Sequence, residues 1–104
     1  MLHIISGYRN PQSLWLNCAK SLNETDSIIF IAGGVELLDM PEPASSIQAI
    51  LVKKNIHLFA IGDDIKSRKI DCGFFQREGM TLSLISHKQF ADLVIKHPSS
   101  LTWF

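Results

Sequence analysis

Short apolar runs alternate along this chain with longer amphipathic stretches, the pattern of strands alternating with helices. The four runs that we predict to be strands are Leu2–Ser6, Ser27–Ala32, Ile56–Ile61 and Met80–Ile85. The second run is apolar at every position from Ile28 to Ala32, which is typical of a strand covered on both faces in a parallel sheet. The fourth run alternates apolar and polar residues, so we expect it at an edge of the sheet.

Helix signals fill the segments between these strands. Asn10 followed by Pro11 predicts a helix start, with Asn10 as the N-cap and Pro11 as the first helical residue. After the second strand, Gly33-Gly34 turns the chain into a helical stretch that we expect to be interrupted at Pro41-Glu42-Pro43. Residues 62–69 carry acids in the first turn and bases in the last, which favours a short helix because it complements the helix dipole.

The last helix has the strongest local signals. Ser86 and Gln89 have the spacing of a capping box, and Ile85 and Phe90 that of a hydrophobic staple. The residues that we expect to form its buried stripe are Phe90, Leu93, Val94 and His97. Strands and helices in this alternation predict one α/β domain over residues 1–104, with a mostly parallel sheet, helices on both faces and right-handed crossovers.

The C-terminal segment ends in two large aromatic residues, where chain ends normally fray. Leu101, Trp103 and Phe104 are costly to leave in water, so this segment either folds back onto its own domain or completes an interface with another chain. These three residues are the interface candidates.

Composition narrows the choice of partners. Ten basic and ten acidic residues give a formal net charge of zero, so the chain has no long-range field that attracts nucleic acid or an anionic membrane. The first residues have no basic segment typical of a signal peptide, and the longest apolar run is far too short to span a membrane. We therefore expect a soluble, cytoplasmic protein with no direct contact to nucleic acid or membrane.

Candidate chemistry is sparse. The four histidines share no metal-binding spacing, and no serine lies in a nucleophile elbow. Asp63 and Asp64 follow the third strand, where they would oppose a phosphate, and the chain contains no GxGxxG motif and no P-loop lysine. We expect no metal, no cofactor and no nucleotide; a nucleotide-binding signalling module would rest on fold analogy alone.

The two cysteines lack the spacing of a disulfide framework or a metal site. Cys18 lies about two turns into the first helix, on its apolar stripe, where burial would raise its pKa. Cys72 follows Asp71, whose charge disfavours the thiolate, although Arg68 and Arg77 would offset it if the loop folds back. Neither cysteine is well placed as a sulfur nucleophile.

Four stretches together resemble the DsrH/TusB family, the small subunit of bacterial sulfur-relay complexes. They are Met1-Leu2-His3, the strand and turn from Asp26 to Val35, the segment from Leu58 to Arg68, and the segment from Ile85 through His97-Pro98 to Trp103. The match spans nearly the whole chain. The chain departs from the family at Gly33, where the family usually has an acid, and at Lys69, where it often has glycine.

The resemblance implies a DsrE-like α/β fold and a heteromeric sulfurtransferase complex with two paralogous subunits, DsrE/DsrF-like or TusD/TusC-like. Such complexes pass persulfide sulfur to an acceptor protein, for 2-thiolation of tRNA wobble uridine or, in a related branch, for sulfur oxidation. Their catalytic cysteine lies near the end of the third strand of a paralogous subunit, whereas this chain reads Ala60-Ile61-Gly62-Asp63 there. The resemblance thus favours a non-catalytic subunit; the alternative is a persulfide carrier that uses Cys18, because sulfur-oxidising members have a cysteine in the similar helix.

Overall fold

One parallel sheet of five strands forms the centre of the computed structural model, which describes residues 1–40, 42, 45–76 and 80–104. The strands are β1 (Leu2–Ile5), β2 (Ser27–Phe30), β3 (His57–Ile61), β4 (Leu82–Ile85) and β5 (Ser100–Trp103). They pair in the order β4-β3-β2-β1-β5, and every pairing is parallel. The four strands predicted from the apolar runs are present, each one or two residues shorter than expected.

The fifth strand was not among the strands predicted from the sequence. β5 lies beside β1, with Leu101 opposite His3 and Trp103 opposite Ile5. The C-terminal segment therefore folds back onto its own domain as an edge strand. At the other edge of the sheet lies β4, as its alternating pattern predicted.

The helices of the described residues are α1 (Pro11–Ser21), η1 (Ala32–Asp39), α3 (Gln48–Lys53), α4 (Gly62–Ser67), η2 (Phe74–Gln76) and α5 (His87–Lys96). Two of them, α1 and α5, begin where their capping residues indicated. Asn10 caps α1 by accepting the N–H of Ser13 at 3.0 Å, and both bonds of the capping box join Ser86 and Gln89 at the start of α5. Pro41 and Pro43, where we expected a helix to be interrupted, and Arg77, which we expected to offset the charge of Asp71, lie outside the described residues.

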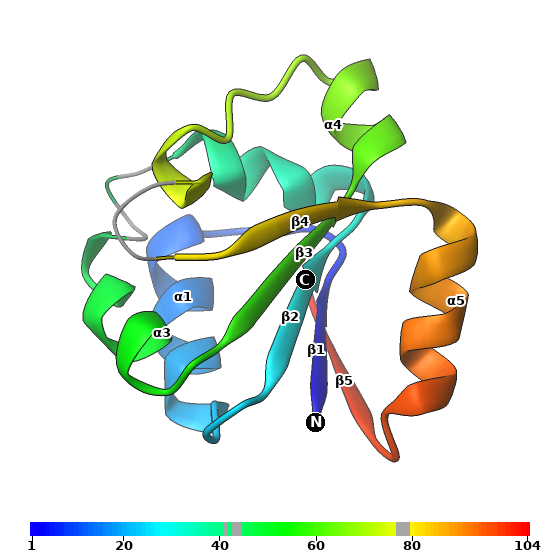
Figure 1. Cartoon of the computed structure of the whole chain (residues 1–104). Coiled ribbons are helices and arrows are strands. Elements are labelled where there is room, and N and C mark those ends of the chain that lie inside the picture. The colour runs from blue at the N-terminus through cyan, green and yellow to red at the C-terminus, as the bar shows by residue number, and fades with distance from the viewer. Residues whose placement is uncertain (41, 43–44, 77–79) are drawn as a thin grey trace.

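The order of the strands decides which face each helix covers. The chain steps from β1 to β2, β3 and β4 in one direction across the sheet, so right-handed crossovers put the connecting helices on one face. The step from β4 to β5 runs back across the whole sheet, so α5 must lie on the opposite face. Figure 1 shows this division, with α1 and α3 on one side of the sheet and α5 on the other.

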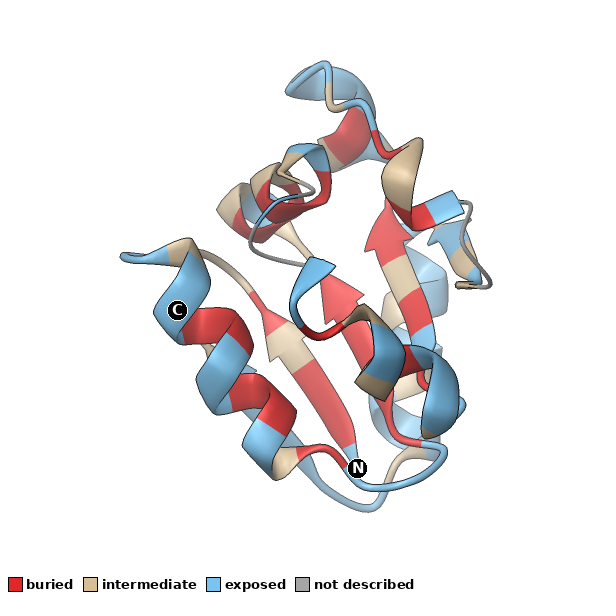
Figure 2. Cartoon of the chain, turned by 90° about the vertical axis from the view of Figure 1, so that its left-hand side faces the viewer, coloured by how far each residue is buried: buried red, intermediate tan, exposed pale blue. Residues whose placement is uncertain are grey.

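Burial is correspondingly unequal on the two faces. The larger core cluster lies beneath α1, η1 and α3 and includes Trp15, Phe30 and Phe75, which are fully buried. Figure 2, viewed from this side, shows buried positions along the strands and on part of the helices in front of them. The smaller cluster beneath α5 has Leu2, Ile29 and Ile61 as its buried members.

The predicted buried stripe of the last helix is only half covered. No residue of α5, which is described throughout, is fully buried; Phe90, Leu93 and His97 are half-buried and Val94 is 38% exposed. The reason is that, among the helices that the structure describes, α5 is alone on its face, so none of them packs against its flanks. Part of the sheet beside α5 is therefore left uncovered.

Candidate functional site

The carboxyl ends of the strands, where ligands bind in open parallel sheets, carry a cluster of polar side chains. Glu36 in η1 accepts two hydrogen bonds there, at 2.9 Å from the hydroxyl of Tyr8 and at 2.8 Å from Nη1 of Arg68. Burial, with help from the Glu36 hydrogen bond and charge, raises the pKa of Tyr8, so its hydroxyl stays protonated and continues to donate. We call Tyr8, Glu36, Asp64 and Arg68 the carboxyl-edge cluster.

Asp64 joins this cluster to the turn after β2. Its carboxylate accepts the backbone N–H of Ala32 at 2.8 Å, and Ala32 has a positive φ of 48° that few non-glycine residues adopt. A carboxylate thus occupies the backbone donor that a bound phosphate would need. Asp63 lies 3.9 Å from Nδ1 of His87, and both side chains are exposed to solvent.

Neither cysteine has the environment of a reactive thiol. Cys18 is fully buried in the core beneath α1, and burial, reinforced by the charge of Asp26, raises its pKa to about 12. Cys72 is buried too, and its pKa is also raised, chiefly by burial and further by nearby carboxylates. With a pKa of about 12, Cys18 holds almost no thiolate at neutral pH, and the raised pKa of Cys72 also disfavours its thiolate, which is the nucleophile in sulfur transfer.

The C-terminal strand is fastened to the sheet through a buried histidine. The indole N–H of Trp103 donates to Nδ1 of His3 at 3.2 Å, and the two rings stack with their centroids 6.3 Å apart. Because the indole nitrogen can only donate, Nδ1 of His3 must be the acceptor, and the ring proton sits on Nε2. That nitrogen lies 3.0 Å from the Asp26 carboxylate, so His3 connects β5 to Asp26.

Asp26 holds the other end of this chain of contacts. Burial by itself raises the pKa of Asp26, but hydrogen bonds from the backbone of Asn23, from His3 and from the terminal ammonium of Met1 outweigh it, and the net pKa is lowered. Asp26 is therefore ionised at neutral pH although it is buried.

The three interface candidates differ in exposure. Trp103 is half-buried and packs against the larger core cluster, whereas Leu101 is 41% and Phe104 77% exposed. Both exposed side chains belong to the C-terminal segment at the edge of the sheet, and in the described part of the chain no strand pairs with the outer side of β5. An uncharged strand edge flanked by exposed apolar residues is a surface that a partner chain can cover.

Comparison with protein families identifies the chain. The family model described as DsrH like protein matches residues 12–100. The chain belongs to the DsrH family. DsrH proteins are subunits of sulfur-relay complexes, and the chain is therefore a sulfur-relay protein that acts with other subunits. No individual protein of established function matched it.

At both positions where this DsrH chain departs from the family pattern, the backbone has room for the residue that the family usually has. Lys69 has a φ of 54°, in the left-handed region that favours glycine. At Gly33 an added Cβ would lie 3.6 Å from the nearest oxygen, so an acidic side chain fits there. At Gly34, in contrast, a Cβ would collide with the carbonyl oxygen of Ile5, so only glycine permits this packing of η1 against β1.

Sequence reasoning did not find the carboxyl-edge cluster of this DsrH chain. Tyr8 and Arg68 bind Glu36 from positions 28 and 32 residues away, and no local motif connects them. Among the described residues, no group of three His, Cys, Asp or Glu side chains could hold a metal ion, and no helix there has the length and apolar character to cross a membrane.

Proposed function

We propose that this chain is a non-catalytic subunit of a heteromeric sulfurtransferase complex that relays persulfide sulfur in the cytoplasm for 2-thiolation of tRNA wobble uridine. The observation that carries the proposal is the burial of Cys18 in the core, with a pKa of about 12. Accepting a persulfide requires an accessible thiolate, and this thiol is neither accessible nor ionised. The reacting cysteine must then come from another subunit.

The end of β3 supports the same conclusion. Paralogous subunits are expected to carry their cysteine near this position, where this chain has Gly62 and Asp63 as the first residues of α4. The neighbouring carboxylate of Asp64 is engaged with the backbone of Ala32, and Glu36 is engaged with Tyr8 and Arg68. These side chains shape and stiffen the edge of the sheet and supply no nucleophile.

The C-terminal segment is the surface that we assign to subunit contact, with paralogous DsrE/DsrF-like subunits as the partners. Leu101 and Phe104 expose apolar area, and the formal net charge of zero leaves no repulsion between subunits. Obligate interfaces resemble a domain core cut in half, and exposed aromatic side chains are their common anchors. Trp103 contributes to this contact surface indirectly, because its ring holds β5 in place.

Native mass spectrometry of the chain, purified alone and together with its two paralogous subunits, tests the proposal. We expect a stable complex that contains all three chains, and we expect Phe104→Ala to weaken it by about tenfold or more, as truncation of an interface aromatic does. The exposed Lys53→Ala variant is the control. A monomer that ignores both paralogues would contradict the assignment.

Measurements of tRNA thiolation in cells test whether the relayed sulfur ends in tRNA. Cells that lack this chain should lose 2-thiouridine from their tRNA, measured by mass spectrometry of nucleosides, and Cys18→Ser should restore it fully. Loss of thiolation that Cys18→Ser fails to rescue would favour the carrier role for Cys18. Unchanged thiolation together with impaired oxidation of reduced sulfur would favour the sulfur-oxidation branch.

A further inference from the structure

A groove of about 590 Å³ opens between α5 and the strands on the less covered face. It exists because α5 is the one helix of the described residues on this face, so it leaves the outward side of β3 and the end of β4 partly uncovered. Phe59, Ile85 and Leu93 form the apolar part of its lining, and all three are half-buried. The volume lies in the range of small-molecule sites.

Ser27 gives the groove a polar floor. Ser27 is 6% exposed and lines the groove; its hydroxyl makes no hydrogen bond within the described part of the chain and keeps some contact with solvent. A hydroxyl that reaches the groove can donate a hydrogen bond to the anionic group of a ligand. His57 lies directly opposite Ser27 in the register of β2 and β3, so both side chains leave the sheet on the same face.

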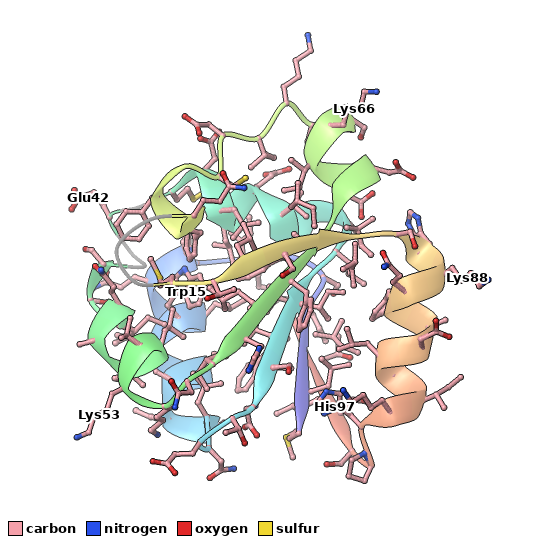
Figure 3. The ribbon with its side chains drawn as sticks, in the orientation of Figure 1. Trp15, Glu42, Lys53, Lys66, Lys88 and His97 are labelled. Atoms are coloured by element: carbon pink, nitrogen blue, oxygen red, sulfur yellow. The ribbon has the colours of Figure 1, made fainter. Side chains whose placement is uncertain are left out.

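The end of α5 adds two more donors at the same end of the groove. Lys96 lines it and takes part in none of the ion pairs among the described residues. His97, whose place beside the starts of the strands is seen in Figure 3, has a pKa lowered by burial and by the charges of the terminal ammonium and Lys96. Its neutral ring keeps one N–H donor at neutral pH.

The acidic residue of the groove lining, Asp92, lies farther from the amino-terminal ends of the strands than Lys96 does. Asp92 precedes Lys96 by four positions on α5 and therefore lies one turn nearer the carboxyl ends of the strands. The groove thus has an ammonium, two imidazoles and a hydroxyl at the end where β2 and β3 begin, beside the carboxylate of Asp26, which is already paired with the Met1 ammonium and His3.

We propose that this groove binds a small organic acid. The anionic group lies among Ser27, His57 and Lys96, and the apolar body lies on Phe59, Ile85 and Leu93. The anionic end of the site is at the amino-terminal ends of the strands, away from the carboxyl-edge cluster, and the site is independent of the proposed role in the sulfurtransferase complex.

Titration of the ¹⁵N-labelled chain with 3-phenylpropionate, followed by amide chemical shifts, tests the proposal. We expect saturable shifts at Ser27, His57 and Lys96, with binding about tenfold tighter than that of the uncharged 3-phenylpropan-1-ol, because a hydrogen bond to a charged group exceeds one to a neutral group by about that factor. Shifts that do not saturate, that lie elsewhere, or that the alcohol reproduces at equal affinity would overturn it.

Variants of the lining residues test where in the groove the carboxylate of 3-phenylpropionate binds. Lys96→Gln and Ser27→Ala should each weaken 3-phenylpropionate binding by about threefold or more, and Asp92→Asn should strengthen it. Lys88→Gln is the matched control, because Lys88 lies on the same helix near its opposite end and points away from the sheet (Figure 3). If Lys88→Gln and Lys96→Gln weaken binding equally, the effect depends only on the net charge of the protein, and this result would contradict the proposed site.

Discussion

His3 and Trp103, 100 positions apart in the chain, are joined by a 3.2 Å hydrogen bond between Nδ1 and the indole N–H. The bond connects the first strand of the sheet to the last, and the far side of His3 contacts Asp26. Both ring nitrogens of a fully buried histidine are thereby used. This arrangement explains how a strand at the very end of the described chain stays ordered on the sheet.

The contribution of this hydrogen bond can be isolated by Trp103→Phe, which keeps an aromatic ring and removes the N–H. We expect the free energy of unfolding to fall by about 1–3 kcal/mol, because Nδ1 of buried His3 loses its donor. Urea unfolding measures the change. Phe104→Leu, at an exposed position, should change stability by less than about 0.5 kcal/mol. Equal effects of the two variants would show that the hydrogen bond contributes nothing.

The two adjacent glycines after β2 should respond very differently to alanine. Gly34→Ala places a methyl group against the carbonyl oxygen of Ile5, a backbone atom that cannot rotate away, and we expect a loss of about 2 kcal/mol or more. Gly33→Ala has room and should cost less than about 1 kcal/mol. Thermal unfolding of both variants provides the comparison. Similar melting temperatures would contradict the close approach of η1 to β1.

Lys69 is a position at which glycine should stabilise the protein. Its φ of 54°, just after α4, is unfavourable for a residue with a Cβ, so Lys69→Gly should raise the free energy of unfolding by about 0.5–1 kcal/mol. Lys66→Gly, inside α4, removes the same side-chain type from a helical position and should lower stability by about 1 kcal/mol. Chemical unfolding of the pair tests the opposite signs.

Asp26 should make the protein sensitive to acid. Its pKa in the folded state lies below the ordinary value of 3.8, so the unfolded chain takes up the proton first as the pH falls. The stability that Asp26 contributes is complete well above that value and is lost as the pH drops through the lowered folded-state pKa. Unfolding measured from pH 6 to pH 2 should show a shallower acid dependence for Asp26→Asn. Parallel curves would exclude this contribution.

Cys18 should be unreactive in the folded protein. Because its side chain is buried and its pKa is about 12, iodoacetamide at pH 8 should modify it at least about a hundredfold more slowly than in denaturant. Peptide mass spectrometry reads each cysteine separately. Rapid native alkylation of Cys18 would revive the carrier hypothesis.

Several features of this protein followed from the sequence because they depend on neighbours within a few residues. The apolar run from Ile28 to Ala32 predicted a strand covered on both faces. Ile28, Ile29 and Phe30 are fully buried, whereas Ile31 is half-buried and Ala32, beyond the end of β2, is exposed. The caps at Asn10 and Ser86 predicted the starts of α1 and α5, since each bond joins residues three positions apart. The resemblance to DsrH rested on such local stretches too, and the family comparison bore it out.

Other features were decided only by the tertiary structure. Whether the segment ending in Trp103 is a strand depends on its pairing with β1, which no local pattern encodes. The contacts of Tyr8 and Arg68 with Glu36 arise because three separate connections meet at one edge of the sheet. The groove beside α5 depends on the direction in which the last crossover returns across the sheet. Strand order and crossover handedness bring distant residues together, and they are properties of the whole chain.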